Sequence, residues 1–433
     1  MSLHELLRER AAQGRPIRVG VVGAGQMGVG LICQMELMVG MRAVAVADID
    51  PQRAVKGYIK AGVSEEAVVK AADAALAATA IEEGKRVALT SATTLTAIPN
   101  LDVVVEATGI PDVGAKVAWD AILNRKHVLQ MNVETDATVG YLLRRMAKAA
   151  GVVYTLTIGD EPGAAKSLYD FAHTLGFEIV CIGKGKNNPL DRTATPESCA
   201  KKAAEKDMNP KMLASFVDGT KTMVEMTSLG NGIGYVPDVR GMHGPQASPE
   251  TLSRVFVPKA EGGVLDSTHV VEYALGSVAP GVFLVFTTDQ PKVLKDLTYL
   301  SMGPGPYYSL YRPYHLANIE TPISIARAVL KGETTLATDR LPVAETVAVA
   351  KRDLKAGERI DGIGGFTVYG IIEKAEVARA EDLLPIGLAY GCTLVRDVAQ
   401  DTPITYADVE LDETLTICQL RRLQDEMIGE ASK

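Results

Sequence analysis

Residues 17–48 constrain the fold more than any other stretch of the chain. A short apolar run at 17–22 has the composition of a buried parallel strand, and the glycine-rich turn GAGQMG follows it directly at 23–28. A helix-compatible apolar stretch comes next, and a second buried strand at 42–47 ends at Asp48. Strand, glycine turn, helix, strand and terminal acid in this order predict a dinucleotide-binding fold.

Each part of that fingerprint has its own physical role. Gly23 allows the tight turn, Gly25 lets the backbone approach a pyrophosphate, and Gly28 lets helix and strand pack closely. The unpaired N–H groups at the start of the helix bind the phosphate. Asp48 can accept hydrogen bonds from the adenosine ribose, and its charge favours NAD. Two basic residues just beyond Asp48 could offset repulsion of a 2′-phosphate, so NADP stays open.

Length, composition and net charge limit the class of protein to which this chain can belong. At 433 residues the chain is long enough for two or three domains, and 47% hydrophobic with 23% charged residues is typical of a soluble globular protein. A net charge near −8 gives no support for nucleic acid or membrane binding, so an anionic substrate must rely on local cations. Residues 1–14 predict a surface helix rather than a signal peptide. The five cysteines have neither metal-ligand spacing nor a paired pattern, which indicates a cytoplasmic protein.

The βα alternation continues to about residue 157. We expect a long helical stretch at 51–83, strands at 86–89 and 102–107, and a strand at 127–130. The loops that follow the last two of these strands lie at the carboxyl edge of the sheet, where the nicotinamide half of a cofactor binds. Besides the glycines and Asp48, the predicted cofactor contacts are therefore Gln26, Met27, Thr108, Gly109 and Asn132.

Three segments carry a resemblance to known families. The turn at 23–28, VEATG at 105–109 and KHVLQMN at 126–132 resemble the homoserine dehydrogenase-like Rossmann oxidoreductases. In homoserine dehydrogenases an Asn-Lys pair usually ends the last segment. Here Asn132 is followed by Val133, which argues against homoserine as the substrate. Residues 350–358, 384–388 and 404–409 resemble a SAF domain, a small β-rich module.

The combination of these two parts resembles the DXP reductoisomerase-like (DRL) family. The resemblance implies NADPH-dependent conversion of 1-deoxy-D-xylulose 5-phosphate to 2-C-methyl-D-erythritol 4-phosphate, a step of isoprenoid precursor synthesis. The expected fold is α/β, with a doubly wound parallel Rossmann sheet, an α+β catalytic domain and a small β-rich SAF-like domain. We place these domains at 1–158, 159–341 and 342–433, the last including a C-terminal helix.

The first candidate cluster beyond the Rossmann domain is GKGKNN at 183–188. It follows a predicted strand at 177–182 and suits an anion or a proton transfer to a carbonyl oxygen. Lys186 is slightly preferred to Lys184, because glycines on both sides leave Lys184 less fixed. Asn187 and Asn188 are predicted to bind substrate. The alternative is a solvated turn with incidental lysines.

The second and third clusters supply carboxylates, cations and a histidine. Asp160 and Glu161 could act as acid or base, or hold Mg²⁺ or Mn²⁺, although the same residues also suit a turn and a helix cap. His243 lies between two glycines, as an active-site histidine often does, but a surface residue is an equal alternative. The predicted substrate contacts of the third cluster are Asn231, Arg240, Arg312 and His315.

Three functions are compatible with these features. The first is a DRL-type reductoisomerase acting on a phosphorylated deoxyketose. The second is a dehydrogenase of another small hydroxy acid, amino acid or sugar acid. The third is a dinucleotide-sensing protein without turnover. We also expect a homo-oligomer, because the C-terminal part is β-rich and residues 307–315 carry many aromatic side chains.

Overall fold

The computed structural model describes residues 1–431, which form two units. Unit 1 consists of residues 1–160, 316–339 and 419–431, and unit 2 consists of Glu161–His315 and Arg340–Cys418. The chain therefore leaves unit 1 and returns to it twice. Within the described residues, no helix is long and apolar enough to cross a membrane.

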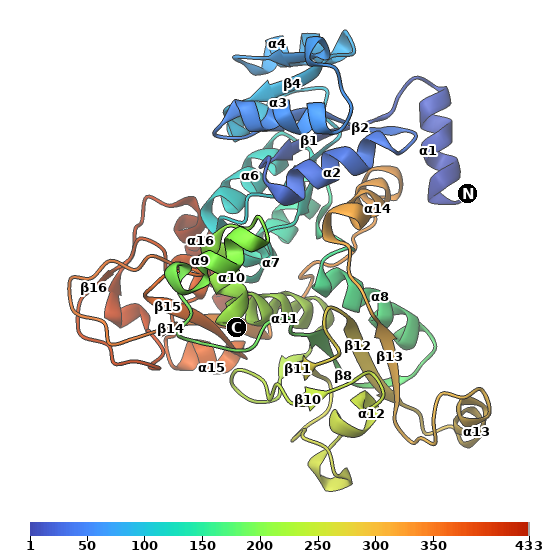
Figure 1. The fold of residues 1–433 in the computed structure, drawn as a ribbon, viewed down its shortest axis with the longest axis vertical. Helices are drawn as coiled ribbons and strands as arrows, with labels where there is room; N and C mark the ends of the chain where they lie inside the picture. Colours follow the sequence, from blue (N-terminus) through green and yellow to red (C-terminus); the bar gives the residue numbers. More distant parts are fainter. Residues whose placement is uncertain (432–433) are drawn as a thin grey trace. The chain divides into compact units, whose positions relative to one another are not determined.

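Unit 1 is built on a seven-stranded sheet in the order β3-β4-β2-β1-β5-β6-β7 (Figure 1). All neighbouring strands are parallel. Apart from the short edge strand β3, this is the Rossmann order, with a reversal beside the central strand β1. The strands are β1 (Ile17–Val22), β2 (Met41–Ala47), β3 (Val68–Lys70), β4 (Arg86–Leu89), β5 (Val103–Glu106), β6 (His127–Gln130) and β7 (Tyr154–Leu156).

Helices follow most of these strands, as in a βα alternation, and the expected helix at 51–83 is broken. Gly62 has φ +86° and ends the first helical piece, and a short strand, β3, follows before Asp73 caps the next helix. The long helical stretch predicted there is therefore wrong. The helices of this part are α1 (Leu3–Ala12), α2 (Gln26–Glu36), α3 (Pro51–Lys60), α4 (Ala74–Glu82), α5 (Ala92–Thr96), α6 (Pro111–Leu123) and α7 (Val133–Ala150), with η1 (Glu65–Ala67).

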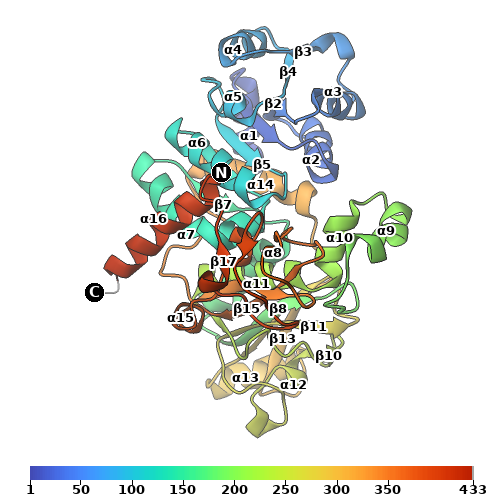
Figure 2. The ribbon, with the colours of Figure 1, turned by 90° about the vertical axis from the view of Figure 1, so that its left-hand side faces the viewer.

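Two helices from distant parts of the sequence complete unit 1. α14 (Ala317–Lys331), orange in Figure 1, packs beside α2 and α1, and its Ile325 and Ala326 belong to the core of the Rossmann sheet. α16 (Thr416–Ala431), red in Figure 2, crosses α7, where the side chain of Gln424 accepts a hydrogen bond from the backbone N–H of Leu142 at 3.0 Å. The unit division therefore differs from the three consecutive domains expected from the sequence.

Unit 2 contains a mixed six-stranded sheet. Its order is β10-β11-β8-β12-β13, and β9 pairs with β11. β8 runs to Gly185, so Lys184 lies within the strand and not after it as expected. The strands are β8 (Glu178–Gly185), β9 (Val236–Pro237), β10 (Gln246–Ala247), β11 (Val270–Gly276), β12 (Val282–Thr287) and β13 (Tyr308–Arg312). The helices are α8 (Glu161–Thr174), α9 (Pro196–Glu205), α10 (Pro210–Val217), α11 (Thr220–Ile233), α12 (Leu252–Val255) and α13 (Pro291–Tyr299), with η2 (Lys259–Glu261).

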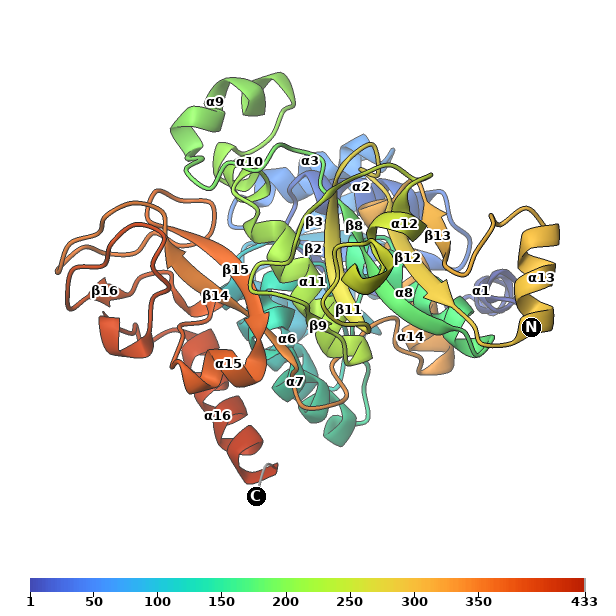
Figure 3. The ribbon, with the colours of Figure 1, turned by 90° about the horizontal axis from the view of Figure 1, so that it is seen from below.

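The SAF-like part of unit 2 packs on α11 through an antiparallel pair, β14 (Ala344–Ala350) and β15 (Val368–Lys374) (Figure 3). The hydroxyls of Thr227 and Thr346 lie 2.7 Å apart, and the backbone N–H of Gly370 donates to Thr220 Oγ1 at 2.8 Å. Short elements make up the rest, as the sequence predicts: α15 (Ala375–Ala380), η3 (Ile386–Leu388), β16 (Thr393–Leu394), η4 (Tyr406–Asp408) and β17 (Val409–Glu410).

Candidate functional site

The glycine turn of unit 1 has the geometry that a dinucleotide requires. Gly23 adopts φ +99°, which favours glycine, and a Cβ on Gly28 would lie 1.9 Å from the carbonyl oxygen of Gly23. A Cβ on Gly25 would meet nothing within 4 Å, so space remains in front of the backbone there. Gly25 is also the N-cap of α2 and makes no side-chain capping bond. The first turn of α2 thus fits the role of a pyrophosphate cradle.

Asp48 lies at the carboxyl end of β2, beside this turn. Its Oδ2 accepts a hydrogen bond from Ala24 N at 2.8 Å, and its Oδ1 accepts one from Asp50 N at 3.0 Å. These bonds fix the carboxylate at the place where a Rossmann acid meets the adenosine ribose. Gln26 and Met27 are exposed in the same turn.

Several buried polar side chains lie together at the carboxyl ends of β5 and β6. Asn132 caps α7 by accepting from Thr135 N at 3.2 Å, and it donates to Ile110 O at 2.9 Å, which anchors the loop that contains Thr108 and Gly109. The neighbouring Glu106 is fully buried, and its Oε1 accepts from Thr108 N at 2.8 Å. Burial raises the pKa of Glu106 to about 7. The predicted loops therefore meet here, with Asn132 shaping the loop through its own hydrogen bonds.

A second constellation lies in unit 2 around Lys184 on β8. Its Nζ lies 2.6 Å from Glu161 Oε1, in the first turn of α8, and donates to Glu225 Oε2 from α11. All three side chains are more than nine-tenths buried. We call this group the lysine centre. Such a set of buried ionisable groups is unusual outside functional sites, because burying charge is costly unless the charges pair.

The two glycines that flank Lys184 make it rigid, contrary to the expectation from the sequence. A Cβ on Gly183 would lie 1.9 Å from Glu272 O, and one on Gly185 would lie 2.2 Å from Ala279 N. Both positions therefore need glycine because neighbouring backbone approaches closely. Lys184 is fixed in a strand, and the preference for Lys186 on grounds of flexibility is wrong.

The charges in the lysine centre favour one protonated carboxyl group beside the charged ammonium of Lys184. Burial opposes the charge on Lys184, but the two carboxylates outweigh it and raise the lysine pKa. Burial raises the pKa of Glu225, and the nearby charge of Glu161 raises it further. With the ammonium balanced by one carboxylate, the second carboxyl group holds a proton more tightly than in water. Glu225 is the better candidate for that proton, since it is the more deeply buried of the two.

Two further predicted residues share this face of unit 2. His315 Nε2 lies 3.5 Å from Glu161 Oε1, and its Nδ1 lies 2.9 Å from Pro280 O. Val282 on β12 pairs with Lys184 on one side and Arg312 on the other, so the lysine and the arginine belong to one cross-strand row. At the usual strand spacing their backbones lie roughly 10 Å apart, and residues in register point to the same face of a sheet.

The remaining members of the 183–188 cluster do not join the lysine centre. Lys186 donates to the carbonyl oxygens of Asn188 at 2.7 Å and Phe216 at 2.8 Å, so backbone acceptors hold its ammonium. Burial and the charge of Lys184 lower its pKa to about 8. Asn187 is exposed, and the side chain of Asn188 accepts from Lys202 at 3.0 Å.

Asn231 and Arg240 bind other parts of the protein. Asn231 Oδ1 accepts from the backbone N–H groups of residues 343 and 344, and its Nδ2 donates to Ala344 O at 3.1 Å, which ties α11 to β14. Arg240 forms ion pairs with Glu373 and Glu381. These contacts give both residues a structural role, and the substrate contact expected from the sequence stays a prediction.

Asp160 and His243 complete the predicted set. Asp160 precedes Glu161 directly at the start of α8. His243 lies in a separate group with Asp238, Asp266 and Glu272. Sequence reasoning missed Glu225. The signal that could have found it is a lone acid in the otherwise apolar and small-residue helix MVEMTSLG at 223–230, where an unpaired carboxylate could not be buried.

Two family models match the chain. Residues 159–321 match the oxidoreductase DRL catalytic domain, and residues 345–410 match the SAF domain. The chain carries a DRL catalytic domain. It is an oxidoreductase with a Rossmann unit of the kind that binds NAD or NADP, followed by a SAF domain. The alternative of a sensor without turnover does not agree with this match. No curated protein matches the chain in sequence.

Solved structures with a similar fold are distant. A probable dehydrogenase from Thermotoga maritima is 13% identical, with a TM-score of 0.42, over 73% of this chain and 90% of that chain. A scyllo-inositol dehydrogenase from Lactobacillus casei with bound NAD(H) is 14% identical, with a TM-score of 0.37, over 63% and 74%. The 1-deoxy-D-xylulose 5-phosphate reductoisomerase from Zymomonas mobilis with NADPH is 17% identical, with a TM-score of 0.36, over 50% and 58%. At such scores these likenesses carry no argument about substrate.

Proposed function

We propose that this DRL oxidoreductase uses NAD(P)H to reduce the carbonyl group of a small anionic substrate at the lysine centre. The specific substrate we propose is 1-deoxy-D-xylulose 5-phosphate, with 2-C-methyl-D-erythritol 4-phosphate as the product. The observation that carries the proposal is the buried ammonium of Lys184 between the carboxylates of Glu161 and Glu225, within the DRL catalytic domain.

In the lysine centre, Lys184 supplies a positive charge and Glu225 supplies a proton. A bound nicotinamide would supply a hydride to the carbonyl carbon, whose oxygen would then become an alkoxide. Lys184 is too basic to be a good proton donor, but its fixed positive charge stabilises developing negative charge. Glu225 holds a proton tightly and can donate it to the alkoxide, which becomes a hydroxyl group. For the deoxyketose, the bond between its carbons 3 and 4 breaks and a bond between carbons 2 and 4 forms before the reduction. The proton of the carbon 3 hydroxyl passes to the ketone oxygen of carbon 2, and carbon 3 becomes the aldehyde that is reduced, so the rearrangement causes no net redox change.

The anionic end of the substrate needs a cation at some distance from the carbonyl. We assign this role to Arg312, which lies in the same cross-strand row as Lys184 and whose guanidinium stacks on the ring of Tyr314 at 4.5 Å. A guanidinium can bind two phosphate oxygens at once. The roughly 10 Å between the two backbone positions suits a five-carbon sugar phosphate better than a small hydroxy acid.

A divalent metal is not part of the proposed steps. Glu161 and Glu225 have the oxygen ligands that Mg²⁺ prefers, but the Lys184 ammonium bonds to both of them and takes the place of a cation. These carboxylates also belong to a group of acidic side chains that could hold a metal ion, so the Mg²⁺ or Mn²⁺ site expected from the sequence stays a prediction.

The test is oxidation of NADPH and of NADH at 340 nm with 1-deoxy-D-xylulose 5-phosphate, with identification of the product by NMR. Parallel reactions contain Mg²⁺, Mn²⁺ or EDTA. Turnover that forms 2-C-methyl-D-erythritol 4-phosphate is the expected result. Reduction of the ketone without rearrangement would instead identify a simple dehydrogenase. Cofactor binding without any turnover would overturn the proposed substrate.

A further inference from the structure

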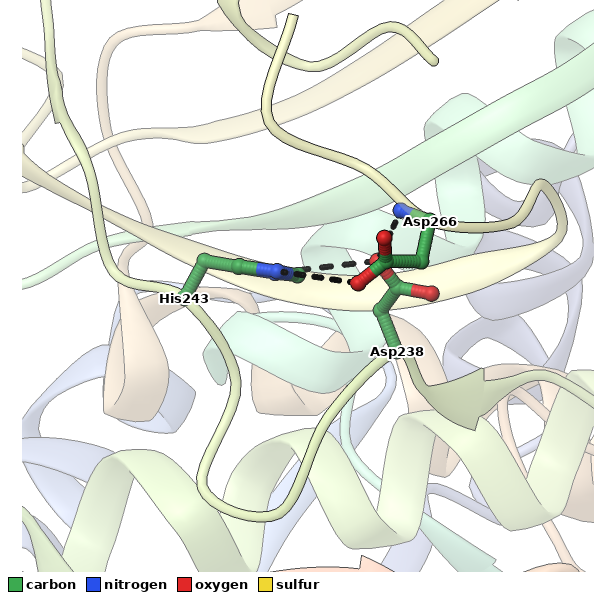
Figure 4. Close-up of side chains that lie close together, drawn as sticks. All are labelled: Asp238, His243 and Asp266. Atoms are coloured by element: carbon green, nitrogen blue, oxygen red, sulfur yellow. Dashed lines mark hydrogen bonds and ion pairs between the residues drawn. The ribbon is translucent and has the colours of Figure 1, made fainter. Parts of the chain in front are cut away.

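A second group of ionisable side chains lies in unit 2, away from the lysine centre. Asp238 follows β9, His243 lies five residues further in the same loop, and Asp266 precedes β11. One ligand atom from each of the three lies within 4.8 Å of the others. Figure 4 shows the imidazole directed at the two carboxylates. Together with Glu272 on β11, we call these residues the histidine cluster.

The histidine cluster and the lysine centre belong to opposite faces of the sheet. On the paired strands β8 and β11, Glu272 is in register with Gly183, and Tyr273 is in register with Lys184. Successive residues of a strand point to opposite faces, so Glu272 and Lys184 point away from each other. The histidine cluster is therefore not an extension of the site proposed above.

Glu272 holds the imidazole in one orientation. Its Oε1 lies 2.7 Å from His243 Nδ1, and the same carboxylate accepts from the backbone N–H groups of His243 and Gly244 at 2.8 and 3.3 Å. The Glu272 side chain is fully buried. With its carboxylate as acceptor, Nδ1 carries the hydrogen, and Nε2 keeps its lone pair. A carboxylate behind a histidine in this way is the usual arrangement for a metal-binding imidazole.

Within the described residues, the lone pair of His243 Nε2 accepts no hydrogen bond. Among residues 1–431, this buried nitrogen has no hydrogen-bond partner, and Asp266 Oδ2 is 4.0 Å away. That separation is too long for a hydrogen bond. It is close to the roughly 3–4 Å expected between two ligands that each lie about 2.1 Å from one metal ion.

The carboxylates are held in place but retain coordinating capacity. Asp238 Oδ1 accepts from Ser267 N and Oγ at 3.0 and 2.6 Å, and its Oδ2 accepts from Asp266 N at 2.6 Å. Asp266 is half exposed, and its Oδ1 binds Lys259 Nζ at 2.7 Å, which leaves Oδ2 facing the imidazole. Three carboxylates and one ammonium surround the imidazole, so these four groups together carry two excess negative charges.

We propose that Asp238, His243 and Asp266 bind one divalent transition-metal ion, with Zn²⁺ as the best match, through the imidazole and one oxygen of each aspartate, whose ligand atoms lie within 4.8 Å of one another. One imidazole and two carboxylates suit Zn²⁺ or Mn²⁺ and not Mg²⁺, which prefers oxygen ligands alone. Water reaches the site on the exposed side of Asp266 and completes the coordination. The ion links two separate segments beside β11, the loop at 238–245 and the segment that contains Asp266, and is structural. This site does not depend on the proposed function.

The test uses the full-length protein, freed of metal with EDTA and titrated with ZnCl₂, MnCl₂ or MgCl₂ by calorimetry. We expect one Zn²⁺ per chain at this site, weaker Mn²⁺ binding and little Mg²⁺ binding. Asp266→Asn and His243→Gln should each weaken Zn²⁺ binding at least tenfold, since even orienting groups around metals are worth 10- to 100-fold. His4→Gln removes an exposed histidine of α1 and should bind Zn²⁺ like the wild type.

Further measurements distinguish loss of this zinc site from misfolding and from metal binding at the lysine centre. Asp266 is on the surface, so Asp266→Asn should fold normally, and the melting temperature of the wild type should rise with Zn²⁺ more than that of the variant. X-ray absorption at the zinc edge should show one imidazole among oxygen ligands. Glu225→Gln should retain this Zn²⁺, which separates it from any ion at the lysine centre. Zinc affinity unchanged in both Asp266→Asn and His243→Gln, or no bound zinc, would overturn the proposal.

Discussion

We expect Asp48, directly after β2, to influence the choice between NAD and NADP. Its carboxylate is fixed by Ala24 N and Asp50 N, so its charge stays beside the ribose position. Asp48→Asn keeps an acceptor for Ala24 N but removes the repulsion of a 2′-phosphate. We expect the affinity for NADPH relative to NADH to rise about tenfold, as expected when one nearby like charge is removed. Fluorescence titration with both cofactors measures this ratio, and an unchanged ratio would show that Asp48 does not face the ribose.

Glu106 makes the stability of unit 1 depend on pH. Burial raises its pKa from 4.5 to about 7, so the folded state binds the proton more tightly than the unfolded state. The stability present below pH 4.5 is therefore lost as the pH rises towards 7. Glu106→Gln removes this loss, and its free energy of unfolding relative to wild type should increase by about 2–3 kcal/mol between pH 5 and pH 8. Urea unfolding at both pH values tests this, and an equal difference at the two would contradict it.

At the scale of single residues, the sequence predicts positions whose role depends on local backbone geometry. Gly23, Gly25 and Gly28 have the surroundings that the fingerprint requires. The position of Glu225 as a lone acid in an apolar helix is a signal in the sequence, but its pairing with Lys184, 41 positions away along the chain, arises only in the folded protein.

A buried lysine directly after β14 joins the SAF domain to the region of α10 and α11 through hydrogen bonds and an ion pair. Lys351 Nζ donates to Ala194 O at 2.7 Å, Gly365 O at 2.8 Å and Asp218 Oδ2 at 2.9 Å. Lys351→Met leaves the Asp218 carboxylate buried and unpaired. We expect a loss of about 3–5 kcal/mol in the free energy of unfolding.

A matched control lies in the same domain. Lys355 forms an ion pair with Asp397 at 2.7 Å, but both side chains are exposed. Lys355→Met should reduce the free energy of unfolding far less than Lys351→Met does, because water screens surface pairs. Equal costs for the two variants in urea unfolding would show that Lys351 does not fasten the SAF domain.

The helix predicted at 51–83 and the predicted end of β8 were wrong for identifiable physical reasons. The stretch 51–83 is rich in helix-forming residues, but Gly62 and Asp73 divide it, and β3 pairs with β4 in the interval. Composition alone does not reveal an edge strand of three residues. β8 extends to Gly185 because the sheet continues beside it through β11 and β12, which local sequence cannot show.

At the scale of the whole molecule, the path of the chain could not be predicted from consecutive segments. α14 and α16 follow segments of unit 2 in sequence but contribute to unit 1. The aromatic run at 307–315 is also used within unit 2, where Tyr308 is buried and Tyr311 donates to Val278 O at 2.9 Å. It therefore gives no support to the predicted homo-oligomer, which stays a prediction for sedimentation analysis.

The central claim is that carbonyl reduction takes place at the lysine centre, and Glu225→Gln tests it most directly. NADPH oxidation with 1-deoxy-D-xylulose 5-phosphate is compared across pH for wild type, Glu225→Gln and the exposed control Glu250→Gln. We predict that the wild-type rate declines above neutral pH, as Glu225 loses its proton. The Glu225→Gln rate should fall about 10²- to 10⁴-fold with unchanged NADPH affinity and without that decline. Wild-type turnover by Glu225→Gln would contradict the account.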